Sequence, residues 1–365
     1  MSQVLLSSGR PLASIPACAL RSNWMAHRYS EDTMQHVIFS EIGGPEVLKV
    51  ESFELPEIGP DEVRVSIEAI GVNRFEALYR RNFYVIPPSL PSVLGAEGVG
   101  TVVGMGGQVS GYRIGDRVAI LPVQTPFVGS GIYATHANVP ASAVVKSIAG
   151  TTAAEEAAVW MAGLQAYNLI TKVPVGSGDS VLVTAGTSPV GSALIQFAQD
   201  MGAIVFATTR TNTRKQELLD LGAHHVIATD EQALTDIVMD AAGGNGVKVV
   251  LDTVGGALLA HCVACLAEGG SLFSYGAQTS PDITAARVDV PLVALDRRSL
   301  SFVDLFELTD VPERFAAAKE YIRDAVARSA YKPRVDSTFD LAEVQEAHWR
   351  MEDGALSGKV VITTK

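Results

Sequence analysis

The chain from Ser180 onward alternates short apolar runs with stretches of helical period. The apolar runs have the length of buried strands and read VLVTA, AIVFATT, HHVIA, VKVVLDTV, SLFSYG and SLSFVD. The stretches between them read VGSALIQFAQDMG, TRKQELLDLG, EQALTDIVMDAAGG and ALLAHCVACLAEGG, and the pattern of the last one is helical up to Gly269. This alternation predicts an α/β fold with a doubly wound sheet of parallel strands and right-handed crossovers.

The region from Met34 to about Ala149 has a different pattern, in which Gly and Pro break short apolar runs. It predicts mostly β-structure, with strands at VRVSIEAIGV, GVGTVVGMG, DRVAILPV and YATHANVP. Thr152 and Glu155 have the spacing of a capping box and predict a helix through AAVWMAGLQAYNLI. The pattern after the α/β series resembles that of the first region again. It predicts helices around 312–329 and 341–351 and a strand at 359–363. A chain of 365 residues has room for two domains.

The first 33 residues differ from the rest, because they are rich in Arg and Ser and hold no acidic residue before Glu31. Two interpretations fit this composition. A transit peptide, which is rich in Arg and Ser and poor in acids, would direct the protein to mitochondria. A disordered extension upstream of a start at Met34 would leave the protein in the cytoplasm, and we favour this second interpretation.

Composition narrows the class of partner. The net charge of −12 at pH 7 argues against a nucleic-acid surface, and no run of eighteen apolar residues predicts a membrane span. Cys18, Cys262 and Cys265 are too few for a disulfide framework, which suggests a reducing compartment. Cys262 and Cys265 form a C-x-x-C inside a helical pattern, and we interpret them as two small buried residues.

The first strand of the α/β series leads into a glycine-rich turn. The turn consists of Gly186, Thr187, Ser188, Pro189, Val190 and Gly191, which match G-x-G-x-x-G with Ser in the middle position. Small residues here let backbone amides approach a pyrophosphate at the start of a helix, and Pro suits a first helical turn. Because the motif comes first in a β-α series, it predicts a dinucleotide site rather than an ordinary strand–helix turn.

The end of the second strand indicates which dinucleotide is bound. An NAD-binding chain usually has Asp or Glu about twenty residues after the glycine motif, where the acid binds the ribose 2′-hydroxyl. This stretch instead holds Thr209, Arg210 and Arg214, with no acid before Glu217. These side chains can hydrogen-bond and neutralise a 2′-phosphate, although a solvated basic helix start is the alternative. The pattern favours NADPH.

Six segments carry a resemblance to a known family, and they occur in the family's order. They are GVNRFEALYRRNFY, PPSLPSVLGAEGVGTV, YRIGDRVAILP, WMAGLQAYNLI, AGTSPVG with VLDTVGG, and MEDGALSGKVVI. With them the chain resembles the medium-chain dehydrogenase/reductase superfamily, in particular its zinc-free quinone oxidoreductase branch. The resemblance implies a GroES-like partial β-barrel catalytic domain of residues 34–158 and 303–365, with a Rossmann NADP-binding domain of residues 159–302 between them. It also implies a homodimer joined through the Rossmann sheets, for which SLSFVD is the expected edge.

The residues at the zinc position of this superfamily differ here. Zinc-dependent members carry a Cys near the position of Asn73 and a His in a G-H-E motif. The motif in this chain is Gly95-Ala96-Glu97, and no Cys lies between Cys18 and Cys262. Because zinc needs three or four thiolate, imidazole or carboxylate ligands, we expect no metal.

The resemblance also implies which residues act on the substrate. It places Asn73 and Tyr84 in the acceptor cleft, although Asn73 also suits a turn and Tyr84 also suits loop packing. Thr253, Val254 and Gly276 follow strands at their carboxyl ends, where doubly wound sheets bind ligands. We expect hydride transfer from NADPH to a small electrophilic acceptor, either a quinone or an activated alkene. An enoyl-thioester reductase and an NADPH-binding protein with little catalysis are the alternatives.

Overall fold

The computed structural model describes residues 34–123 and 131–364. The predicted N-terminal extension, residues 1–33, lies outside the described residues, as does most of the loop from Thr125 to Ile132. No helix in the described ranges has both the length and the apolar composition that a membrane crossing requires.

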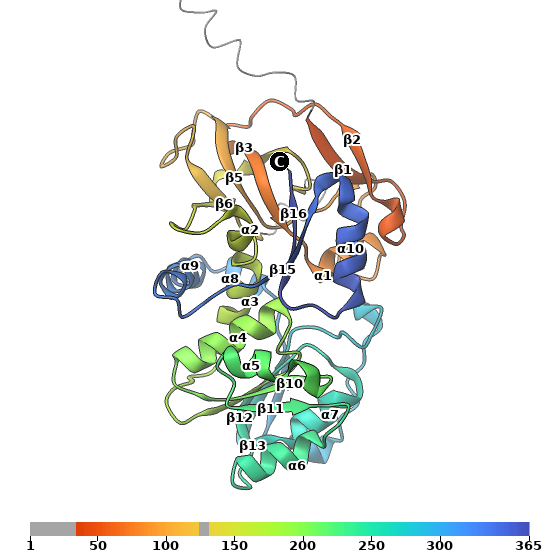
Figure 1. Cartoon of the computed structure of the whole chain (residues 1–365), viewed down its shortest axis with the longest axis vertical. Coiled ribbons are helices and arrows are strands. Elements are labelled where there is room, and N and C mark those ends of the chain that lie inside the picture. The colour runs from red at the N-terminus through yellow and green to blue at the C-terminus, as the bar shows by residue number, and fades with distance from the viewer. Residues whose placement is uncertain (1–33, 124–130, 365) are drawn as a thin grey trace, which may run out of the picture. The chain divides into compact units, whose positions relative to one another are not determined.

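A six-stranded parallel sheet occupies the middle of the sequence (Figure 1). Its strands are β9 (Ser180–Val183), β10 (Ile204–Thr209), β11 (His225–Ala228), β12 (Val247–Asp252), β13 (Leu266–Ser274) and β14 (Ser299–Phe302). Their order across the sheet is β11-β10-β9-β12-β13-β14, and every neighbouring pair is parallel. This is the order of a Rossmann-type sheet, in which the winding direction reverses between β9 and β12. The predicted doubly wound sheet is therefore confirmed.

Four helices connect the first five strands of this sheet. They are α4 (Pro189–Asp200), α5 (Lys215–Asp220), α6 (Leu234–Ala241) and α7 (Gly256–Ala264). In α4 the side chains of Leu194, Ile195 and Phe197 are fully buried. Burial of each such side chain contributes about 1.5–3 kcal/mol to folding, so packing more than helix propensity holds α4 against the strands.

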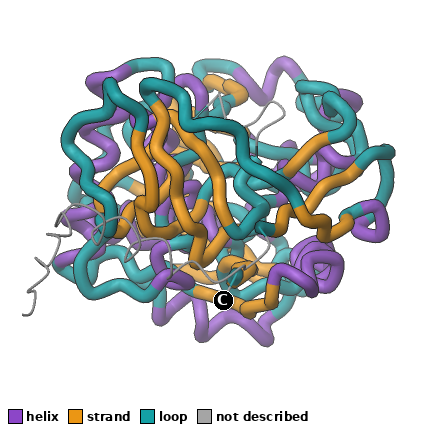
Figure 2. The backbone as a smooth tube through the Cα atoms, turned by 90° about the horizontal axis from the view of Figure 1, so that it is seen from above, coloured by secondary structure: helices purple, strands orange, loops and turns teal. Residues whose placement is uncertain are grey.

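The second large sheet is mainly antiparallel and belongs to the GroES-like part of the chain. Its strands are β3 (Glu62–Gly71), β5 (Gly98–Met105), β6 (Arg117–Ile120), β7 (His136–Pro140), β8 (Val144–Lys146), β15 (Val335–Asp340) and β16 (Lys359–Thr363). The order is β15-β16-β3-β5-β6-β8, with β7 also paired to β3. Strand β16 lies between β15 and β3, with Ile362 opposite Ile70. Segments from both ends of the described chain thus share one sheet. Figure 2 shows, in a view from above, strands that run side by side and loops that join their ends.

Among the described residues, the remaining elements are a small sheet, six α-helices and several short 3-10 helices. The small sheet has the order β2-β1-β4, from β1 (Gln35–Phe39), β2 (Lys49–Ser52) and β4 (Ser92–Val93). The helices are α1 (Arg74–Arg80), α2 (Ala153–Glu156), α3 (Trp160–Ile170), α8 (Phe306–Thr309), α9 (Pro312–Ala327) and α10 (Val344–Asp353). One cluster of buried side chains joins Trp160 and Leu164 of α3 to Val99 of β5 and Val181 of β9. Helix α3 packs mainly against α4 and α9, and its buried side chains belong to the same cluster as those of both large sheets.

The helix predicted after Thr152 begins as expected but is interrupted. The capping box is present, because Thr152 Oγ1 accepts a hydrogen bond from the Glu155 amide at 3.2 Å and Glu155 Oε2 accepts one from the Thr152 amide at 2.8 Å. Helix α2 ends at Glu156, and α3 starts at Trp160. At the break the amides of Ala158 and Val159 donate to carbonyls three residues back instead of four. The buried Glu156 carboxylate accepts a hydrogen bond from the Ile148 amide at 2.9 Å and so ties α2 to the segment before it.

The helix predicted to run to Gly269 ends earlier, so this expectation was wrong. Helix α7 stops at Ala264, and Leu266 already begins β13 by pairing with Val247 of β12. The pairing of this apolar residue with a neighbouring strand outweighs the helical period that continues through it. Cys262 and Cys265 are both free and buried, as expected from their pattern.

Candidate active site

The glycine-rich turn lies between β9 and α4, where the winding of the parallel sheet reverses. Ser188 is the N-cap of α4, and its Oγ accepts a hydrogen bond from the Gly191 amide at 3.1 Å. Pro189 is the first helical residue and supplies no amide. The amide of Thr187 donates to no described residue, and that of Val190 has no partner inside the helix. The turn therefore presents free amides at the positive end of a twelve-residue helix, as an anion site requires.

The glycines of this turn are needed for close packing. A Cβ added to Gly191 would lie 2.4 Å from the Ala185 carbonyl oxygen and 2.9 Å from the Cα of Gly186. A Cβ on Gly186 would lie 3.0 Å from Ile195 and 3.1 Å from Leu218. Side chains here would push the turn away from α4, so the residues present fit the close backbone approach of a dinucleotide pyrophosphate.

Polar residues follow β9 and β12 and fix the loops at the same edge of the sheet. The Asp252 carboxylate accepts hydrogen bonds from Thr184 Oγ1 at 2.7 Å and from the Gly255 amide at 2.9 Å. Burial raises the pKa of Asp252, and these hydrogen bonds oppose that effect. A Cβ on Gly276, which follows β13, would lie 2.5 Å from Thr253 Oγ1. The predicted residues Thr253, Val254 and Gly276 are thus brought together, with Asp252 as their support.

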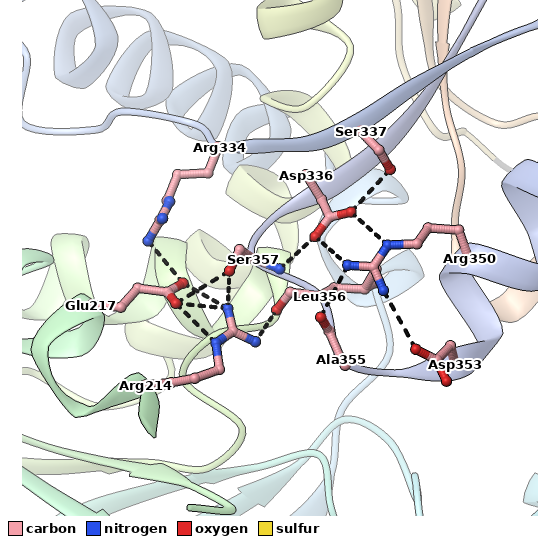
Figure 3. Close-up of polar contacts among 10 residues, drawn as sticks. All are labelled: Arg214, Glu217, Arg334, Asp336, Ser337, Arg350, Asp353, Ala355, Leu356 and Ser357. Atoms are coloured by element: carbon pink, nitrogen blue, oxygen red, sulfur yellow. Dashed lines mark hydrogen bonds and ion pairs between the residues drawn. The ribbon is translucent and has the colours of Figure 1, made fainter. Parts of the chain in front are cut away.

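The predicted 2′-phosphate residues after β10 differ in their surroundings. Thr209 is buried at the end of the strand, and Arg210 is exposed with no side-chain hydrogen bond or ion pair to another described residue. The guanidinium group of Arg214 instead forms hydrogen bonds to several described residues (Figure 3). Its Nε and Nη2 donate to Glu217 at 2.9 and 2.8 Å, and it also donates to the Leu356 carbonyl and to Ser357 Oγ.

The contacts of Arg214 belong to a larger cluster that joins α5 to the end of the chain. Arg334 also donates to Glu217, at 2.8 Å. The Asp336 carboxylate accepts hydrogen bonds from the Ser357 amide at 2.8 Å and from Arg350 Nη2 at 2.8 Å (Figure 3). Two carboxylates and three guanidinium groups therefore fix the loop that precedes β16.

A pocket lies beside α1 in the GroES-like part. Its lining residues are Phe75, Glu76, Tyr79, Tyr84, Ile86, Val93, Leu94 and Gly95. Most of them are apolar, and Tyr84 and Glu76 supply polar groups. The rings of Tyr84 and Phe75 lie 5.7 Å apart. Burial raises the pKa of Tyr84, so its hydroxyl keeps its proton at neutral pH and is available as a donor.

Asn73, the second predicted catalytic residue, lies beside a buried ion pair. Lys359 Nζ is 2.5 Å from Glu97 Oε1 and donates to Asn73 Oδ1 at 2.6 Å. Asn73 Nδ2 donates to Glu97 Oε1 at 3.2 Å and to the Gly71 carbonyl at 3.0 Å. Both amide protons of Asn73 are therefore used inside the protein, and Asn73 does not line the pocket beside α1.

Glu76 is held from one side by a chain of buried polar groups. Its Oε2 accepts hydrogen bonds from the Asn73 amide at 2.8 Å and from the Tyr133 hydroxyl at 2.7 Å. Tyr133 contacts His348 Nε2 at 3.2 Å, and His348 Nδ1 is 3.5 Å from Arg80 Nη1. The other oxygen, Glu76 Oε1, is buried and has no hydrogen-bond partner among the described residues. Burial raises the pKa of Glu76 to about 7, although its hydrogen bonds and Lys359 act against this.

The zinc position contains no set of metal ligands. Ala96 is buried between Gly95 and Glu97 and offers no donor atom. Within residues 34–123 and 131–364, no three His, Cys, Asp or Glu side chains are grouped so that they could hold a metal ion. The Glu97 carboxylate instead accepts hydrogen bonds from Asn73 and from the Met161 amide and pairs with Lys359.

Comparison with known proteins identifies the family. The family described as "Alcohol dehydrogenase GroES-like domain" matches residues 59–149, and that described as "Zinc-binding dehydrogenase" matches residues 221–362. A probable quinone oxidoreductase of Schizosaccharomyces pombe is 31% identical over 327 residues, which are 88% of this chain and 95% of the relative. A quinone oxidoreductase of Pseudomonas aeruginosa is 28% identical over 90% of this chain and 99% of its own length.

Solved structures agree with the sequence comparison. The quinone oxidoreductase of Escherichia coli, complexed with NADPH, superposes with a TM-score of 0.81 at 27% identity and covers 90% of this chain and 100% of its own. A mycobacterial protein complexed with NADPH gives 0.80 at 31% identity, with coverages of 90% and 100%. A GroES-like domain with a Rossmann-type sheet defines a dehydrogenase/reductase architecture. The chain belongs to the medium-chain dehydrogenase/reductase superfamily, in its quinone oxidoreductase branch, and is an oxidoreductase.

Sequence reasoning missed several residues of the site. Asp252 could have been found, because it ends a buried strand at the edge where ligands bind. Tyr133 and His348 carried no local signal, since Tyr133 meets Glu76 from 57 positions away and His348 in turn meets Tyr133. Lys359 stands in the quoted MEDGALSGKVVI segment, but nothing local indicated that its charge is buried against Glu97.

Proposed function

We propose that this protein is an NADPH-dependent reductase of quinones or activated alkenes that works without a metal. The observation that carries the proposal is the glycine-rich turn at the reversal point of the parallel sheet, with free amides at the start of α4. Relatives that are named quinone oxidoreductases, and solved relatives complexed with NADPH, support the same conclusion.

The residues that would hold NADPH follow the edge of the parallel sheet. The amides of the Gly186–Gly191 turn bind the pyrophosphate, and Thr253, Val254 and Gly276 lie where the nicotinamide half passes β12 and β13. Thr209 and Arg210 bind the 2′-phosphate, since the guanidinium of Arg210 is exposed and unpaired among the described residues. Arg214 could bind the 2′-phosphate only by giving up one of its present hydrogen bonds. In its present position it fixes the loop before β16.

The acceptor would bind in the pocket beside α1. NADPH supplies a hydride when it is bound. The acceptor then carries a negative charge, which a hydrogen bond from the Tyr84 hydroxyl stabilises. Asn73 holds Lys359 and Glu97 in place through its amide and so positions the start of α1 rather than touching the acceptor.

Because Ala96 supplies no metal ligand, we expect hydrogen bonds to polarise the carbonyl group of the acceptor. Zinc requires at least three protein ligands, and Ala96 supplies none. Metal analysis of the purified protein is the direct check: we expect activity to survive a chelator, with no stoichiometric zinc.

Stopped-flow measurement of NADPH oxidation tests the proposal. Benzoquinones, enones and enoyl thioesters are tested as acceptors, with NADPH and NADH compared side by side, and cofactor binding is measured separately by nicotinamide fluorescence. We expect turnover of quinones or enones with a preference for NADPH. Turnover of enoyl thioesters alone would establish the enoyl-thioester reductase alternative. Tight NADPH binding without turnover of any acceptor would establish a binding protein instead.

A homodimer would form through the edge of the six-stranded sheet. Strand β14 ends this sheet, and its Phe302 side chain is 55% exposed. An edge strand offers unpaired backbone groups to a second copy. Sedimentation should give the mass of two chains, and a Phe302→Lys variant should shift the mass to one chain. A cytoplasmic location stays a prediction, as does the mitochondrial alternative that rests on residues 1–33.

A further inference from the structure

The buried carboxyl group of Glu76 has one oxygen that its role in the helix does not use. Its Oε2 caps α1 by accepting the hydrogen bond from the Asn73 amide. Its Oε1 has no partner among the described residues, although the side chain is only 1% exposed. Burying a charged oxygen without a hydrogen bond costs on the order of several kcal/mol. A capping role alone therefore does not explain why Oε1 has no described partner.

The hydrogen bonds behind Glu76 fix where its proton resides. Arg80 can only donate, so His348 Nδ1 accepts from it, and the neutral ring carries its hydrogen on Nε2. His348 is neutral because burial lowers its pKa to about 3. The Nε2 hydrogen is donated to Tyr133, whose own hydroxyl hydrogen is donated to Glu76 Oε2. Glu76 Oε2 therefore accepts two hydrogen bonds, and the carboxyl proton is placed on Oε1.

Oε1 is also the Glu76 oxygen that remains available to a molecule in the acceptor pocket, because its hydrogen-bonding capacity is unused among the described residues. Glu76 lines that pocket together with Tyr84, and Oε2 points instead to Tyr133 and the Asn73 amide. When Oε1 carries the proton, it can donate a hydrogen bond, and it then needs a hydrogen-bond acceptor nearby. A carbonyl oxygen in the pocket is such a partner.

We propose that Glu76 is the proton donor of the reduction, and that Tyr133 and His348 are positioning residues that keep its proton on Oε1. This inference rests on the proposed function. A quinone that has taken up a hydride holds two more electrons and one negative charge. The O–H bond of Glu76 breaks, its proton forms a new O–H bond on the reduced acceptor, and the electron pair stays on Glu76 as a carboxylate. Water entering through the pocket returns the proton after the product leaves.

The charges around Glu76 support a carboxyl group that changes its protonation near neutral pH. Glu97 and the apolar surroundings favour its neutral form, and Lys359 favours its charged form. Arg80, which forms an ion pair with Glu352, lies at the far end of the chain of hydrogen bonds, and Tyr79 and Tyr84 line the pocket. Tyr133 keeps its proton, because burial and Glu76 raise its pKa far above the usual range.

Glu76→Gln is the decisive variant, because the amide keeps an oxygen for the Asn73 amide and for Tyr133 but has no acidic proton. We expect kcat to fall about 100-fold, as for loss of a general acid, while KM for NADPH stays unchanged. In the wild type, kcat should fall as the pH rises past about 7, because the donor is then ionised. The Glu76→Gln variant should lose this alkaline decline, and Glu76→Asp should keep it at a lower kcat. Tyr84→Phe is the matched control in the same pocket and should keep the wild-type decline.

A second measurement does not depend on turnover. The infrared spectrum of the wild type minus that of Glu76→Gln should show the carbonyl stretch of a protonated carboxylic acid at acidic pH, and this band should disappear above neutral pH. If no such band is seen, or if Tyr84→Phe rather than Glu76→Gln removes the alkaline decline, the proposal for Glu76 is overturned while the reductase function stands. A wild type that reduces no acceptor overturns both.

Discussion

Arg214 and Glu217 form a bidentate pair one helical turn apart, with Arg214 Nε and Nη2 2.9 and 2.8 Å from the two carboxylate oxygens. Glu217 thereby neutralises a guanidinium that the sequence pattern assigned to the 2′-phosphate. The same Arg214 also donates to Leu356 and Ser357. We therefore expect the preference for NADPH to depend on Arg210, whereas the contacts of Arg214 fasten α5 to the loop before β16.

The first prediction separates these two arginines by cofactor affinity. Arg210→Ala should weaken NADPH binding about 10- to 100-fold, because it removes a charge-assisted hydrogen bond to the 2′-phosphate, and NADH binding should not change. Arg214→Ala should lower the free energy of unfolding by about 1–3 kcal/mol, through loss of its three partners. Fluorescence titration with both cofactors and urea unfolding measure these effects. Equal weakening of NADPH and NADH by Arg210→Ala would contradict the assignment.

The second prediction concerns the buried pair of Glu97 and Lys359. Lys359→Met leaves the Glu97 carboxylate buried without its counter-charge and should cost about 3–5 kcal/mol of unfolding free energy. Glu97→Gln should cost a similar amount, because it leaves the ammonium group unpaired. The double variant should be more stable than the sum of the two losses implies, since neither charge then remains. Urea unfolding of all four proteins gives the coupling energy, and strict additivity would show that the pair does not interact.

The third prediction tests the close packing of the dinucleotide turn. Gly191→Ala should displace the turn and abolish measurable NADPH binding, because the new methyl group would lie 2.4 Å from the Ala185 carbonyl oxygen. Gly176→Ala is the matched control, since its Cβ meets nothing within 4 Å and its backbone needs no positive φ. The control should bind NADPH as the wild type does. Normal binding by Gly191→Ala would show that the pyrophosphate lies elsewhere.

The fourth prediction concerns stability in acid. Burial lowers the pKa of His348 to about 3 from its ordinary value of 6.5, so between these pH values the unfolded chain binds a proton that the folded protein does not. This group should therefore remove up to about 1.4 kcal/mol of stability for each pH unit below 6.5. Glu76, whose pKa is raised, acts in the opposite direction between about pH 7 and 4.5. His348→Gln should flatten the fall in urea midpoint with decreasing pH, and an unchanged slope would show that another group is responsible.

The parallel sheet was predictable because its signal is local. Each strand is a short apolar run, and each connecting helix has its own period, as in VLVTA followed by VGSALIQFAQDMG. The boundary between α7 and β13 was missed for the same reason. Leu266 continues the helical period, and only its pairing with Val247 on another strand makes it a strand residue.

The acceptor site was predictable only in part, because its contacts join distant segments. Tyr84 and Asn73 were found through a family resemblance, whereas Glu76, three residues after Asn73, was not identified as a site residue. Nothing in one sequence shows that His348 meets Tyr133 across 215 positions. Nor does spacing reveal that Asn73 Oδ1 accepts a hydrogen bond from Lys359 Nζ while Asn73 Nδ2 donates to Glu97.

The place of β16 in the sheet has a consequence for synthesis. This strand comes last among the described elements, yet it lies between β15 and β3 and supplies hydrogen bonds to a strand made almost 300 positions earlier. A nascent chain on the ribosome can complete the six-stranded sheet first, whereas residues 69–71 of β3, which β7 does not pair, must wait for their partner strand until residues 359–363 have been made. During that interval Ile70 and its apolar neighbours are available to chaperones, and truncation before Lys359 would leave them permanently exposed.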